Sequence, residues 1–220
     1  MYGVVATLDN EDAANFLVQS VGVEARQQMI MRQFEGLLPM PVWFETRITP
    51  SMQWTLLAPY IMSCPYNPTP MTWQNFPALH ILDGPDATNV SSGPGIANSP
   101  GPLSYDRRKV SFEYDQPGRK VGPGEANYIT KTSARGQPQF AAWISQLDVV
   151  YTPLEAGNGT GNYVQTTQPG VDLFPDTPGG SVVNGTMFIA LVDQKVDTKD
   201  GNINQLDPHI VAGPAIYQAG

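Results

Sequence analysis

The sequence contains a single cysteine, only two histidines and few charged residues. Because Cys64 stands alone, no disulfide can form within this chain and a thiol-rich metal site is excluded. Charged residues make up 15% of the 220 positions, and 20 Asp and Glu against 12 Lys and Arg give a formal net charge of −8. Such a chain repels nucleic-acid phosphates, so nucleic-acid binding is not expected.

Long apolar runs are also missing. None reaches the roughly 20 residues that a bilayer-crossing helix needs, so no membrane span is expected. The opening residues, Met-Tyr-Gly-Val-Val-Ala, lack the basic region and cleavage site of a secretion signal. As written, the sequence is therefore expected to be soluble and to carry no targeting segment.

Catalytic motifs are equally scarce. The sequence has no G-x-S-x-G, P-loop or G-x-G-x-x-G pattern, and neither His80 nor His209 has a nucleophile in a recognisable setting. No catalytic residue, cofactor or bound metal is therefore predicted, and an enzyme is not expected. The segment from Asp193 to Asp207 has an Asp-Gly-Asn centre similar to that of a calcium loop, but the first and third ligand positions hold Val196 and Thr198. A turn after a strand is the better interpretation.

What the sequence does have is an apolar helical pattern from about Asn10 to Glu35. Asp9 or Asn10 can cap it, two acidic residues occupy its first turn, and Gly36 can end it. Its apolar residues follow two separate faces, so we expect this helix to have neighbours on more than one side. The first face contains Ala14, Leu17, Val18, Val21, Ala25 and Met29, and the second contains Phe16, Val23, Ile30 and Phe34.

A short helix is predicted from Pro50 to Ala58, with Thr49 as its cap. The whole chain contains 21 glycines and 21 prolines, which favour turns and loops. Beyond residue 108, short β-rich runs alternate with clusters of turn residues. The predicted strands are Lys109–Tyr114, Ala142–Tyr151, Tyr163–Thr167 and Met187–Val192. The second of these also fits a helical face through Phe140, Trp143, Ile144 and Leu147, but the β-branched and aromatic residues at 149–151 favour a strand. Together the strands indicate a small β-sandwich.

The predicted fold class is therefore α+β, with a long helix and a β-rich, sandwich-like module. The predicted divisions are a helical region at 1–64, a Pro- and Gly-rich linker at 65–107, the β-rich module at 108–196 and a carboxyl-terminal tail at 197–220. If the chain is complete as given, the exposed apolar surface of the helix predicts self-association or binding to a helical partner through residues 10–35.

Two polar residues of the long helix are candidate remnants of a metal site. Glu24 and Gln27 are three positions apart on one helix face, the spacing at which di-metal carboxylate bundles place Glu and His. Gln27 replaces the imidazole with a poor ligand, and the carboxylates of three further helices are missing. A buried Glu24 carboxylate that pairs with Arg26, Arg32 or a cation of a neighbouring element is therefore preferred over a metal ligand.

Surface features allow two further hypotheses. Three N-glycosylation sequons begin at Asn89, Asn158 and Asn184, more than composition alone favours, which indicates a secreted glycoprotein. The four tryptophans could line a carbohydrate-binding surface by stacking, although such residues more often pack in a core. They are Trp43, Trp54, Trp73 and Trp143.

Several segments resemble one known family. GVEARQ at 22–27 followed by MIMRQFEG at 29–36, FAAWISQL at 140–147, NGTMFIALVD at 184–193 and HIVAGPA at 209–215 are similar to the carboxyl-terminal half of fungal secreted ferritin-like proteins, which are described as stress-responsive or desiccation-related. The resemblance implies that the long helix is the remnant of a ferritin-like bundle and that Glu24 with Gln27 marks a vestigial metal position. It also implies a location outside the cell or at the cell wall, and that Met1 is an internal start or the chain is a truncated member of the family.

Three functions follow as hypotheses. The preferred one is a non-enzymatic secreted or wall-associated stress-response protein with a degenerate ferritin-like bundle. The first alternative is a di-metal ferritin-like oxidoreductase whose missing ligands come from other helices or from another subunit. The second alternative is a carbohydrate-binding β module.

Overall fold

The computed structural model describes residues 2–5, 8–62, 72–85, 103–123, 128–157, 161–170, 183–198 and 202–220. Three antiparallel sheets dominate this part of the chain. The first is ordered β1 (Leu79–Ile81), β2 (Lys109–Tyr114), β8 (Tyr163–Thr167) and β7 (Glu155–Ala156). The second is ordered β10 (Ile210–Gln218), β9 (Thr186–Val192), β5 (Phe140–Ser145) and β6 (Asp148–Pro153), and the third pairs β3 (Lys120–Val121) with β4 (Tyr128–Ile129).

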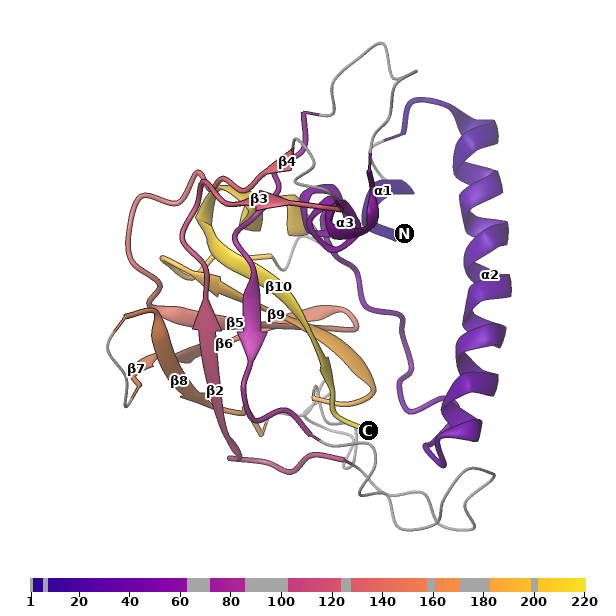
Figure 1. Ribbon diagram of the computed structural model, residues 1–220. Coiled ribbons are helices and arrows are strands. Elements are labelled where there is room, and N and C mark those ends of the chain that lie inside the picture. The colour runs from indigo at the N-terminus through magenta and orange to yellow at the C-terminus, as the bar shows by residue number, and fades with distance from the viewer. Residues whose placement is uncertain are drawn as a thin grey trace.

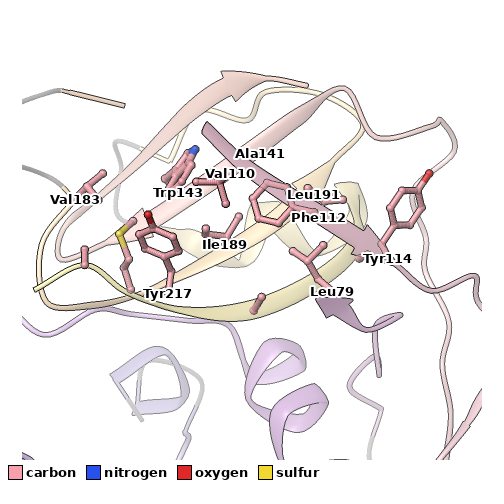
Figure 2. Close-up of a cluster of buried hydrophobic side chains, with 14 residues drawn as sticks. Leu79, Val110, Phe112, Tyr114, Ala141, Trp143, Val183, Ile189, Leu191 and Tyr217 are labelled. Carbon is pink, nitrogen blue, oxygen red and sulfur yellow. The ribbon is translucent and has the colours of Figure 1, made fainter. Parts of the chain in front are cut away.

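The two four-stranded sheets enclose one hydrophobic core. Figure 2 shows side chains from β1, β2, β5, β9 and β10 meeting in the same interior, with Trp143 close to Tyr217. Those two rings meet edge to face at 5.4 Å between centroids, and the Trp143 indole donates a 2.7 Å hydrogen bond to the hydroxyl of Thr152. This arrangement buries a large aromatic pair without leaving its indole N–H unpaired.

A second cluster covers the opposite face of the β10-β9-β5-β6 sheet. Alternate residues of β5 point to the two clusters: Ala141 and Trp143 to the first, Ala142 and Ile144 to the second. The cover comes from α3 (Pro50–Leu57) and from a 3₁₀ helix, η3 (Ile203–His209). The middle sheet is therefore buried on both faces, which explains the nearly continuous apolar sequence of β5 and β9.

α2 (Glu11–Phe34) lies along one side of these layers (Figure 1). Asn10 caps it by accepting a 2.8 Å hydrogen bond from the N–H of Ala13. At the other end Gly36 has a φ of 76°, and the N–H groups of Gly36 and Leu37 return to the carbonyls of Gln33 and Arg32. This is the Schellman arrangement that a left-handed glycine permits, so both predicted ends are confirmed.

The predicted fold class is wrong. α2 is present with 24 residues, but the other helices in the described ranges are short: α1 (Tyr2–Val5), α3 with 8 residues, and the 3₁₀ helices η1 (Ala58–Tyr60) and η3. No helix comparable to α2 packs beside it there, and the β sheets organise the molecule. The remnant of a helical bundle is therefore corrected to a single helix attached to a mostly β body. The apolar periodicity predicted the helix correctly, but it carried no information about what lies beside it.

The predicted divisions do not follow the sheets. The predicted linker supplies β1, which pairs with β2, and the predicted tail supplies β10, which pairs with β9 along most of its length. The predicted strand Ala142–Tyr151 is a hairpin, β5 and β6, joined at Gln146, whose φ is 53°. The strands at Lys109–Tyr114 and Tyr163–Thr167 and the helix beginning at Pro50 with its Thr49 cap are confirmed.

Candidate functional site

The two apolar faces of α2 have different surroundings. The first predicted face is turned toward the rest of the chain: Val21 is buried, and Ala14, Leu17, Ala25 and Met29 are half-buried, whereas Val18 is 50% exposed. The second face points outward: Phe16 is 70% exposed, Val23 45%, Ile30 45% and Phe34 60%. The chain therefore covers one side of its longest helix and leaves an apolar stripe on the other. We call Phe16, Val23, Ile30 and Phe34 the outer stripe.

Arg32 fixes the inward side of α2 to the β body. Its side chain is buried, and it donates a 2.7 Å hydrogen bond from Nε to the carbonyl of Leu38 and another from Nη2 to the carbonyl of Gly220. Burial lowers the pKa of this guanidinium, and the charge of nearby Glu35 raises it in part. The contact joins the last turn of α2 to the end of β10, so the orientation of the helix is set by a buried polar anchor.

A second set of contacts fixes the segment that follows α2. The amide of Asn184 donates to the carbonyl of Pro41 at 2.5 Å, and Gly185 lies so close that an added Cβ would meet the side chain of Val42 at 2.8 Å. The φ of 62° at Gly185 also favours glycine. Farther along, the side-chain oxygen of Gln146 accepts a hydrogen bond from the N–H of Trp43 at 3.0 Å. Residues 41–46 are therefore attached to the β10-β9-β5-β6 sheet.

A small hollow lies between α2 and this segment. Ala25, Gln28 and Arg32 line it from the helix, and Pro41, Glu45 and Thr186 are among the residues on its other side. Its volume of about 50 Å³ holds a few water molecules rather than an organic ligand. The outer stripe, rather than this hollow, is therefore the candidate functional surface.

The candidate metal residues lie on the exposed part of α2. Glu24 and Gln27 are both exposed, so the predicted burial of Glu24 is wrong. Arg32, which was a proposed partner of Glu24, instead binds backbone carbonyls. Among the described residues, no group of three His, Cys, Asp or Glu side chains comes together at a distance suited to a metal ion. The structure therefore brings no further ligand to Glu24. Cys64 lies outside the described ranges.

Of the three glycosylation candidates, Asn184 lies within the described residues. Asn89 and Asn158 lie outside the described residues. Asn184 is half-buried, its amide nitrogen binds the carbonyl of Pro41, and its side-chain oxygen accepts a 2.9 Å hydrogen bond from the N–H of Gly185. A glycan on this nitrogen would replace one of its two hydrogens beside that contact. Asn184 thus has a structural role that its sequon did not reveal.

The tryptophans are divided between core and surface. Trp143 is fully buried, and Trp54 is buried with its ring edge-on to Tyr128 at 5.0 Å. Neither can present a ring face to a sugar. Trp43 and Trp73 are exposed, and they come from different segments of the chain. A carbohydrate surface made of all four tryptophans is therefore wrong, because two of them are needed for packing.

Sequence reasoning missed an acid and imidazole pair. Nδ1 of His209 lies 3.0 Å from Oδ1 of Asp193, and Nε2 lies 3.2 Å from the side-chain nitrogen of Gln194. The other carboxylate oxygen of Asp193 accepts hydrogen bonds from the N–H groups of Arg135 and Gly136 at 3.0 and 3.3 Å. The signal was present in the two apolar runs that end at Asp193 and begin after His209. If they pair as antiparallel strands, these residues become neighbours.

The hydrogen bonds of Asp193 and His209 hold two strands and a loop together. Asp193 follows β9 and His209 precedes β10, so the contact closes the end of that ladder and fixes residues 135–136 against it. Asp193 and Asp207, which bounded the calcium-loop hypothesis, have separate partners. Asp200 and Gly201, at the centre of that hypothesis, lie outside the described residues.

Asp207 is a half-buried carboxyl group beside the start of α3. Burial raises its pKa, and hydrogen bonds from Ser51 and Thr49 lower it in part. Thr49 also caps α3 by accepting a 3.1 Å hydrogen bond from the N–H of Met52. The carboxyl group therefore joins η3 to the first turn of α3 through the hydroxyl groups of Ser51 and Thr49.

These observations define a β-sandwich body that carries one long, laterally attached helix with an exposed apolar stripe. None of the helices in the described ranges combines the length and apolar character needed to span a membrane.

No family model matches the chain. The chain is similar to Protein rds1 of the fission yeast Schizosaccharomyces pombe, with 44% identity over 235 residues. That alignment includes 100% of this chain and 57% of the yeast protein, so the chain spans little more than half of its relative's length.

Proposed function

We propose that this chain is a non-enzymatic interaction protein in which the β body presents the outer stripe of α2 to a helical partner. The observation that carries the proposal is the exposure of four large apolar side chains along one line of a firmly attached helix. Apolar residues repeated at helical spacing are the usual anchors where one helix packs against another. The anchor at Arg32, on the opposite side, presents the stripe without further rearrangement.

The location of the protein outside the cell is proposed from its resemblance to a known family. Similarity to secreted or wall-associated stress-response proteins supports a role outside the cell, and the sequons agree with it. The di-metal oxidoreductase would need ligands from beyond the described residues, because Glu24 and Gln27 stand without a third ligand there. The interaction role needs no such addition and makes direct use of the stripe.

A binding experiment with designed peptides tests the proposal. An amphipathic helical peptide with an apolar seam is titrated into the protein beside a scrambled peptide of the same composition. We expect binding of the amphipathic peptide only, and at least a roughly tenfold weaker affinity for Val23→Asp because a charge then faces the apolar seam.

The same helix supplies a matched control. Val18 has the same side chain and a similar exposure of 50%, but it lies on the other face of α2. Val18→Asp should bind the peptide as the unsubstituted protein does. Equal binding of both peptides, or equal loss in both variants, would mean that the outer stripe is not the binding surface.

A further inference from the structure

The outer stripe belongs to a longer repeat. Counting from Ala13, steps of three and four residues lead through Phe16, Ser20, Val23, Gln27 and Ile30 to Phe34. These are the two inward positions of a heptad, and they fall on one side of α2 for about 30 Å. In each heptad one inward position holds a large apolar residue, namely Phe16, Val23 or Ile30. The other inward position holds Ala13, Ser20 or Gln27, and the series ends at Phe34. The structure leaves the whole series exposed or half-exposed.

We infer that the partner of this stripe is α2 of a second copy of the same chain. The inference rests on the proposed function and names its occupant. An identical helix offers both the protruding side chains of Phe16, Val23 and Ile30 and the spaces beside Ala13 and Ser20, so the stripe is complementary to itself. Self-complementary patches are the basis of two-fold symmetric dimers, the commonest form of soluble oligomer.

The attachment of α2 leaves room for such a dimer. Val21 and Arg32 are buried on the inward side of α2. Phe16, Val23 and Ile30 lie on the opposite side and point away from the β body. In Figure 1, α2 stands at the right margin of the view, and the sheets all lie to its left. Two copies joined stripe to stripe therefore keep their β bodies apart on opposite sides of the helix pair.

The available area is sufficient. At about 200 Å² for a phenylalanine and somewhat less for valine and isoleucine, the exposed parts of the outer stripe amount to roughly 400 Å² per chain. Met31, exposed at the margin of the stripe, and the small residues between the large ones bring two copies to roughly 1,200 Å² in total. That is the lower end of the range for stable protein interfaces, so a dimer that dissociates on dilution is expected.

Gln27 acquires a role in this arrangement. It is the one long polar side chain in the seam, and its amide both donates and accepts hydrogen bonds. A single polar residue at an inward heptad position costs stability but limits the number and register of the helices that associate. Gln27→Leu should therefore associate at least roughly tenfold more tightly and lose its strict dimeric state.

Sedimentation velocity over a wide range of protein concentration tests the inference. We expect a monomer–dimer equilibrium, at least a roughly tenfold weaker dimer in Val23→Asp, and an unchanged equilibrium in Val18→Asp. In a Cys64→Ser background, Ser20→Cys should form an intermolecular disulfide under mild oxidation and Val18→Cys should not, because only Ser20 lies in the seam. Circular dichroism confirms that each variant is folded.

The outcomes separate this inference from the proposed function. A protein that stays monomeric at every concentration overturns the second copy as occupant, and if it still binds the amphipathic peptide through Val23, the interaction role survives. A monomer that also ignores the peptide removes both. A dimer that withstands Val23→Asp and forms no cross-link at Ser20→Cys meets through another surface, which again overturns the inference.

Discussion

Strand β9 and helix α2 are both rich in large apolar residues, yet the chain treats them in opposite ways. Met187, Ile189 and Leu191 of β9 are fully buried between two layers of the same chain, whereas Phe16 and Phe34 of α2 are mostly exposed. The cover of β9 is encoded within the described residues, and the cover of the outer stripe is not. An apolar sequence therefore identifies which residues need burial but not which molecule supplies their cover.

The largest effect is expected inside the β body. Trp143→Ala removes a fully buried ring that packs against Tyr217 and binds Thr152. We expect a loss of about 3–5 kcal/mol in the free energy of unfolding, since the cavity cannot collapse between two sheets. Urea unfolding measures it. A loss below about 1 kcal/mol would contradict the assignment of this ring to the shared core.

The junction between the two regions comes next. Arg32→Met keeps the apolar stem but leaves the carbonyls of Leu38 and Gly220 without their buried donor, at a cost of about 1–3 kcal/mol. Hydrogen exchange should become faster in α2 while the amides of β9 remain protected. Arg26→Met, an exposed arginine of the same helix, is the control and should leave both regions unchanged. If β9 loses protection together with α2, the two regions unfold as one unit.

A pH-dependent effect is expected where η3 meets α3. Because burial raises the pKa of Asp207 above its ordinary value of 3.8, the folded state holds this proton more tightly than the unfolded state. The resulting stabilisation is complete below that ordinary value and is lost as the pH rises through the folded pKa. Asp207→Asn should therefore gain stability relative to the unsubstituted protein between roughly pH 4 and roughly pH 7.

Thermal unfolding across that pH range measures the effect, and Ser51→Ala sharpens it. Ser51 donates a hydrogen bond that lowers the pKa of Asp207, so its removal should shift the pH-dependent loss to higher pH. The outer stripe contains no titrating group, so its exposure should not follow the same profile. A stability difference between Asp207→Asn and the unsubstituted protein that does not vary with pH would show that burial does not perturb this carboxyl group.

Local patterns were sufficient for the elements that local chemistry defines. The capping residues Asn10, Gly36 and Thr49 predicted where the two helices begin or end. β-rich runs bounded by turn residues predicted β2 and β8. β10 escaped prediction because Gly213 and Pro214 interrupt its pattern, although they fit within the strand where its register to β9 shifts. The two apolar faces of α2 were visible in the sequence, but the neighbours expected on more than one side are not found among the described residues, and Val18 of the covered face is exposed. No local pattern showed which distant strands pair. The β body that these strands form, and that covers only one face of α2, could therefore not be predicted.

The smallest effect is expected at Glu24, where the hypothesis of a metal site meets the exposed side of α2. Glu24→Ala removes a carboxylate that is surrounded by solvent in the structure, so the free energy of unfolding should change by less than about 0.5 kcal/mol. Metal analysis of the purified protein is the sharper measurement. Stoichiometric iron or manganese that disappears in Glu24→Ala would restore the di-metal alternative, because a ligand would then have to reach Glu24 from outside the described residues. Unchanged metal content together with unchanged stability would leave α2 as a surface for binding, with the β body alone providing the stable core.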